Sequence, residues 1–84
     1  IDLIKIDVNG YEFSVIKEIR EIIKRDRPAL LIETGSETNK IKKFLKTYSY
    51  GHYIYSNKTK KFYKAKKNYS LDTYFLQNNH LQKN

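Results

Sequence analysis

The chain has 84 residues, enough for one small domain, and its 17 basic and 9 acidic residues give a net charge of +8. It contains no cysteine, which excludes disulfide bonds and cysteine-ligated metal sites and is compatible with a reducing, cytoplasmic location. No apolar run approaches the roughly 20 residues that cross a bilayer, and no secretory signal pattern opens the chain. Methionine is absent even at position 1, so we expect a fragment of a longer protein.

The basic excess is concentrated in the second half of the chain. Residues 38–71 contain ten lysines and no acidic residue. Such a field attracts nucleic acid, acidic membrane surfaces or anionic substrates. Only three basic residues are arginines, the side chains that make bidentate phosphate and guanine contacts, so the composition disfavours nucleic acid. A bias toward A/T-rich codons, which encode the abundant Lys, Ile, Asn and Tyr, explains the same excess without a partner.

The first forty residues show two apolar strands separated by an amphipathic helix. Residues 1–8 are almost continuously apolar, as is typical of a strand in a parallel sheet, and the pair Asn9-Gly10 predicts a turn into a helix. Residues 11–25 form that helix, which Pro28 ends, and residues 29–33 form the second strand. The apolar face of the helix consists of Val15, Ile16, Ile19, Ile22 and Ile23.

A second helix and three tyrosine-rich strands are predicted in the rest of the chain. Ile41, Phe44, Leu45 and Tyr48 share one helical face, and Gly51 follows as a stop. The predicted strands cover residues 52–56, 62–65 and 73–76.

The resulting order is β-α-β-α-β-β-β, which predicts an α/β fold with parallel strands first and antiparallel strands last, at the sheet edge. We expect a single partial domain at 1–77 and a frayed tail at 78–84.

Two acidic residues lie where the predicted parallel strands end. Asp7 comes near the carboxyl end of the first strand and Glu33 at that of the second. Ligands of open α/β sheets bind outside the carboxyl ends of the strands, where a carboxylate can act as a base, a hydrogen-bond acceptor or a ligand. Asn9 and Glu12 are candidates on the same rim. Helix capping or pairing with a lysine explains all four residues equally well.

The histidines and tyrosines give weaker signals. We expect His52 to be a surface strand residue, because no second histidine stands at metal-binding spacing, and no metal site is predicted. His80 falls in the tail. The tyrosines of the later strands are more typical of a half-buried sheet face than of a platform for stacking bases.

The segments DLIKIDVNGYE at 2–12 and RPALLIE at 27–33, with the helix between them, resemble the FkbM-like S-adenosylmethionine-dependent methyltransferases. The two strands would be the fourth and fifth core strands of that family, so the resemblance implies the C-terminal half of a Rossmann-like sheet. It also implies methyl transfer to an oxygen of a sugar or small metabolite. The matching positions are Asp2, Lys5, Asp7, Val8, Gly10, Glu12, Pro28 and Glu33.

By this resemblance, Asp7 lies at the cofactor and orients or deprotonates the acceptor hydroxyl, and Glu33 supports it. Asn9 and Glu12 would contact the substrate. The chain departs from the family at Asn9, where glutamate is usual, and at Glu18, where glycine is expected. An amide can hydrogen-bond but cannot act as a base, so Asn9 weakens the expectation of catalysis.

The three glycines lie far apart and make no glycine-rich cofactor loop. We therefore expect the isolated chain to bind S-adenosylmethionine weakly or not at all and to be inactive. A sheet edge left exposed would favour self-association. The two alternatives are a small basic nucleic-acid-binding module built on the lysine-rich region and a non-catalytic remnant used for interaction.

Overall fold

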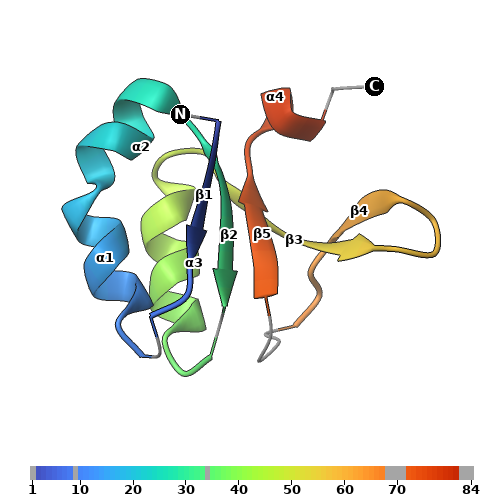
Figure 1. Ribbon diagram of the computed structural model, residues 1–84, viewed down its shortest axis with the longest axis horizontal. Coiled ribbons are helices and arrows are strands. Elements are labelled where there is room, and N and C mark those ends of the chain that lie inside the picture. The colour runs from blue at the N-terminus through green and yellow to red at the C-terminus, as the bar shows by residue number, and fades with distance from the viewer. Residues whose placement is uncertain (1, 9, 34, 68–71, 82–84) are drawn as a thin grey trace.

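The structure is a computed structural model that describes the whole chain except residues 1, 9, 34, 68–71 and 82–84. It forms one five-stranded sheet with helices (Figure 1). In chain order the elements are β1 (Leu3–Ile6), α1 (Glu12–Glu18), α2 (Arg20–Asp26), β2 (Ala29–Glu33), α3 (Thr38–Lys46), β3 (Gly51–Ser56), β4 (Lys61–Lys64), β5 (Asp72–Leu76) and α4 (Asn78–Leu81).

The strand order across the sheet is β1-β2-β5-β3-β4. The β1–β2 pair is parallel, as predicted, and β5 pairs antiparallel with both β2 and β3. The α/β class is confirmed, but the expected position of the last strand at the sheet edge is wrong. β5 lies at the centre because its side chains Thr73, Phe75 and Leu76 are buried, whereas the lysine-bearing β4 is fully exposed and suits an edge.

The long helix expected at 11–25 is divided into α1 and α2 at Ile19. The backbone of Ile19 has φ −96° and ψ 15°, outside the helical range. The N–H of Ile19 still donates to the carbonyl of Val15, and the N–H of Ile23 donates to the carbonyl of Ile19. α1 therefore runs directly into α2, with Ile19 as the one irregular residue between them. Among the residues described, every helix is too short or too polar to cross a membrane.

The segment expected to be a frayed tail begins with the single-turn helix α4. The Nδ1 atom of His80 accepts a hydrogen bond from the N–H of Gln77 at 2.8 Å. Its Nε2 atom lies 3.0 Å from the carbonyl oxygen of Arg27. Gln77 also donates from its side chain to the carbonyl of Tyr48. These contacts attach the end of β5 to the C-terminal ends of α2 and α3.

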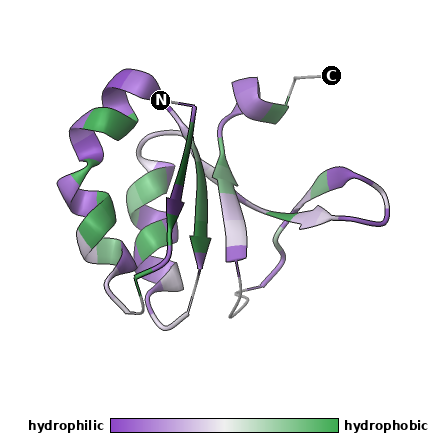
Figure 2. Ribbon diagram, viewed as in Figure 1, coloured by the Kyte–Doolittle hydropathy of each residue, from purple (hydrophilic) through white to green (hydrophobic). Residues whose placement is uncertain are grey.

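The hydrophobic core lies on one face of the sheet. Alternate strand residues Ile6, Leu30, Ile32 and Phe75 are buried in one cluster with helix residues, so α1, α2 and α3 cover this face. Figure 2 shows β2 as hydrophobic along its length up to a hydrophilic last residue, Glu33. The helix residues in the cluster are Ile16, Ile23, Ile41 and Leu45.

The opposite face of the sheet, here called the open face, has no helix over it among the described residues. Leu3 on this face is 55% exposed, and Leu31 and Tyr74 are half-buried. Tyr55, Phe62 and Tyr74 form an aromatic cluster there with ring centroids 5.0–6.5 Å apart. The half-buried sheet face that the tyrosines predicted is thus found. The open face consists of Leu3, Lys5, Ala29, Leu31, Tyr53, Tyr55, Phe62, Lys64 and Tyr74.

Two neighbouring leucines test which face carries the core. Leu30 is fully buried, so Leu30→Ala should lower the free energy of unfolding of the 84-residue chain by about 2–5 kcal/mol. Leu31→Ala removes the same atoms from the open face and should cost about 1 kcal/mol or less. Urea unfolding followed by circular dichroism measures both. Equal losses would show that the open face is also covered in solution.

Candidate active site at the carboxyl ends of β1 and β2

The parallel register of β1 and β2 brings Asp7 and Glu33 together. Ile6 pairs with Ile32, so the next position in each strand places Asp7 beside Glu33. The interaction with Asp7 is the largest cause of a raised pKa at Glu33, so the two carboxyl groups lie close together. Because side chains alternate along a strand, both carboxyl groups lie on the side of the open face. The juxtaposition of these two residues that the sequence predicted is found.

Other acidic groups add to this pair. The β2–β5 pairing places Asp72 directly opposite Glu33. Hydrogen bonding of protonated Glu33 to Asp7 raises the pKa of Glu33, and repulsion from Asp7, partial desolvation and the charges of Asp72 and Glu12 raise it further. The rim therefore favours one bound proton and attracts positive charge. We call Asp7, Glu33 and Asp72 the acidic rim.

Asp72 was not among the predicted site residues. An antiparallel strand begins where its parallel neighbour ends, so an acid directly before the last strand lies at the carboxyl end of β2. The residue could have been found from the sequence only if β5 had been assigned as the neighbour of β2.

The side chain of Glu12 stabilises the turn that leads into α1. Its side chain is only 6% exposed, and its Oε1 atom accepts a hydrogen bond from the N–H of Gly10 at 3.1 Å. Gly10 has φ +90°, a conformation that side-chain-bearing residues rarely adopt. Helix-start chemistry thus accounts for Glu12, whose charge still acts on Glu33. A contact between Glu12 and a substrate stays a prediction. Asn9 lies outside the described residues.

A second glutamate connects the two loops at this end of the sheet. Oε1 of Glu37, just before α3, accepts a hydrogen bond from the N–H of Phe13 in the first turn of α1 at 3.4 Å. The Phe13 and Phe44 rings pack edge to face behind this contact. Beside it, Tyr11 is 70% exposed and Val8 is also exposed, so apolar side chains are available next to the acidic rim. Sequence reasoning missed Glu37, because the contact joins residues 24 positions apart.

His52 is not the surface residue that the sequence predicted. Its side chain is 5% exposed and lies on the helix-covered face, opposite Phe75 in the β3–β5 pairing. The alternation of β3 determines this orientation, and a lone histidine among tyrosines gives no sign of which face it occupies. His52 belongs to a separate pocket, described below.

The fold and the acidic rim define a class of protein, an α/β protein with paired carboxyl groups at the carboxyl ends of adjacent parallel strands. Residues 1–53, from β1 into β3, match the family described as the methyltransferase FkbM domain. The match covers more than half of the 84 residues, so the chain belongs to the FkbM methyltransferase domain family. The resemblance seen in the sequence is confirmed. No curated protein and no solved structure matches the chain significantly.

The raised pKa of Glu33 predicts a gain in stability when its charge is removed. The folded state holds the Glu33 proton more tightly than the unfolded chain does, so the contribution of Glu33 to stability is greatest below pH 4.5 and is lost as the pH rises through the folded-state pKa. Glu33→Gln should therefore raise the unfolding temperature at neutral pH, and the gain should vanish near about pH 3. Glu18→Gln, on the exposed side of α1, is the matched control and should change little. A loss of stability in Glu33→Gln at neutral pH would contradict this account.

Proposed function

We propose that the chain is the C-terminal half of a Rossmann-like, S-adenosylmethionine-dependent methyltransferase domain, which methylates a hydroxyl oxygen of a sugar or small metabolite. The observation that carries this proposal is the placement of the Asp7 and Glu33 carboxyl groups side by side at the carboxyl ends of adjacent parallel strands. Membership of the FkbM family supports methyl transfer as the reaction class.

The acidic rim fits a positively charged cofactor. Three acidic residues lie together there, since Asp7 is beside Glu33 and Asp72 is opposite it, and the charges of Asp7 and Asp72 raise the pKa of Glu33. S-adenosylmethionine, when bound, supplies an electrophilic methyl group on a sulfonium cation. Asp7 is the residue we assign to that end of the cofactor. Nothing in the chain resembles the glycine-rich loop that would hold the nucleotide end, so binding should require a further segment.

The carboxyl groups of Asp7 and Glu33 can also take up the proton that the acceptor hydroxyl loses. A hydroxyl oxygen that forms a bond to the methyl carbon must release its proton while the bond from carbon to sulfur breaks. Asp7, in its ionised form, accepts a hydrogen bond from the hydroxyl and orients a lone pair toward the methyl group. The hydroxyl proton then passes to Asp7, while Glu33, whose raised pKa favours its protonated form, hydrogen-bonds to Asp7 and supports it.

The methyltransferase proposal is tested in the complete gene product, by transfer of a radiolabelled methyl group from S-adenosylmethionine to a panel of sugars and small hydroxyl compounds. Asp7→Ala should lower kcat by about 100-fold or more, the usual contribution of a positioned base. Asp2→Ala, an exposed aspartate before the amino end of β1, is the matched control and should retain activity. Unchanged turnover in Asp7→Ala, or no methyl transfer to any compound, would overturn the proposal.

We also propose that the isolated chain self-associates through β1. This strand has β2 as its one neighbour in the described sheet and carries a single lysine, Lys5. The other edge strand, β4, has a lysine at each end, which opposes edge-to-edge pairing.

The self-association proposal predicts a difference between the two edges of the sheet. Leu3→Lys places a charge on the exposed edge of β1 and should shift the chain toward monomer in sedimentation velocity. Tyr63→Lys makes the same change in β4 and should leave self-association intact. A chain that is monomeric at every concentration tested would contradict the proposal.

A further inference from the structure

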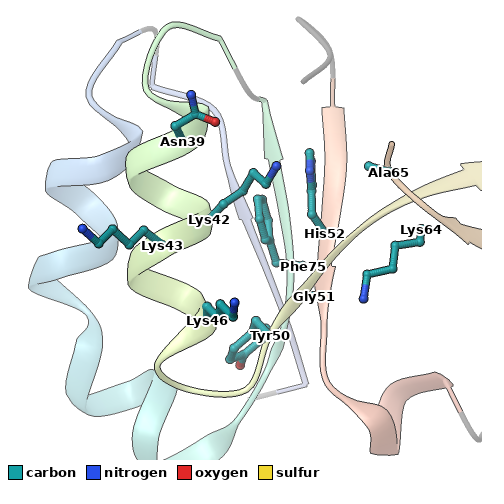
Figure 3. A pocket seen from close by; sticks show the side chains of 10 residues that line it. All are labelled: Asn39, Lys42, Lys43, Lys46, Tyr50, Gly51, His52, Lys64, Ala65 and Phe75. Carbon is teal, nitrogen blue, oxygen red and sulfur yellow. The ribbon is translucent and has the colours of Figure 1, made fainter. Parts of the chain in front are cut away.

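A concave region lies on the helix-covered side of the sheet, between α3 and the strands β3 and β5. The pocket has a volume of about 500 Å³ and shares no residue with the acidic rim. None of its lining residues is acidic. Three of its lysines come from α3, and Lys64 of β4 borders it on the far side, with its amino group directed away from the ring of His52 (Figure 3). The lining consists of Asn39, Lys42, Lys43, Lys46, Tyr50, Gly51, His52, Lys64, Ala65 and Phe75.

His52 lies at the inner wall of this pocket with one polar atom unsatisfied. The imidazole stacks on the ring of Phe75, with centroids 4.6 Å apart and planes 11° from parallel. Its Nε2 atom is 2.8 Å from the hydroxyl oxygen of Thr73. Its Nδ1 atom is buried and has no hydrogen-bond partner among the described residues. A buried nitrogen without a partner is unfavourable by about 1–3 kcal/mol, so a group that paired with it would be stabilised there.

Burial keeps the His52 ring neutral, and a neutral ring still has one N–H group that can donate a hydrogen bond. Burial, with a smaller effect from the charge of Lys42, lowers the pKa of His52 to about 4. A neutral ring carries one N–H group. When the Thr73 hydroxyl donates to Nε2, the proton of the ring is on Nδ1, which then acts as a donor toward the pocket. The positive charge comes from lysines and the directed hydrogen bond comes from His52.

We propose that this pocket binds the phosphoryl group of a small molecule, with Lys42 and Lys46 supplying charge and His52 Nδ1–H supplying a hydrogen bond. In Figure 3, Lys42 extends from α3 toward the ring of His52, whereas Lys43 points away from it. Lysine binds phosphate as a point charge and needs no bidentate geometry. The proposal is independent of methyl transfer at the acidic rim.

The shape of the region favours a small ligand over a nucleic acid strand. A strand is bound along an extended groove with aromatic platforms, and its affinity falls steeply with salt. Here the unsatisfied atom is enclosed, and the aromatic ring beside it, that of Phe75, is already covered by His52. The exposed aromatic cluster of Tyr55, Phe62 and Tyr74 lies on the open face, on the other side of the sheet.

The test is a nuclear magnetic resonance titration of the 84-residue chain with inorganic phosphate and with glycerol 3-phosphate, at constant ionic strength maintained with chloride. We expect saturable shifts of the His52 ring nitrogens and of the α3 amides. Lys42→Gln and Lys46→Gln should each weaken binding about fivefold. Lys58→Gln removes the same charge from the turn between β3 and β4, outside the pocket lining, and should leave affinity within about twofold.

His52→Phe keeps a ring to stack on Phe75 and removes the donor, so a folded variant should lose the saturable response. Lys42→Gln and Lys46→Gln keep the proposal testable if His52→Phe does not fold. Three results would each overturn the proposal. One is the absence of shifts at His52, and another is equal weakening by all three lysine variants. The third is binding of a single-stranded oligonucleotide, steeply dependent on salt, without any response to phosphate.

Discussion

The register between β1 and β2 is the constraint on which the rest of the molecule depends. Pairing Leu3 with Ala29 sends Ile6 and Ile32 into the core together and leaves Asp7 beside Glu33 one step later. A slip by one residue would turn the apolar side chains of one strand toward the open face and separate the carboxyl groups. The same contact that buries the centre of the sheet therefore creates the acidic rim, and core stability and site geometry are inseparable here.

Acidic and basic side chains gather on opposite sides of the sheet, which the net charge alone does not show. The acidic rim lies on the open-face side, whereas the lysine-lined pocket and His52 lie on the helix-covered side. Acidic groups that repel one another are kept at the rim at a cost in stability, which is common where a group must exchange protons. A chain with a net charge of +8 can thus present a cation-attracting site and an anion-attracting site on opposite sides of one sheet.

Much of the first half was predictable, because near-continuous apolar strands and a helical apolar face are local patterns. The predicted pairing of Asp7 with Glu33 needed only that two consecutive strands be parallel neighbours. The position of β5, the contribution of Asp72 and the burial of His52 were not predictable, since each depends on which strand lies beside which. The break between α1 and α2 at Ile19 was not predictable either, because the apolar spacing of the helix continues through this residue.

The central position of β5 has a consequence for how the fold is reached. β1 and β2 form one ladder and β3 and β4 another, and residues 72–76 join them. Until that segment is in place, the sheet is two separate two-stranded pieces, each marginal in water. The pairing of β2 with β5 closes a loop of about forty residues, so assembly should be a late, slow event governed by non-local contacts. A deletion at the end of the chain would thus not trim the sheet at its border but divide it through the middle.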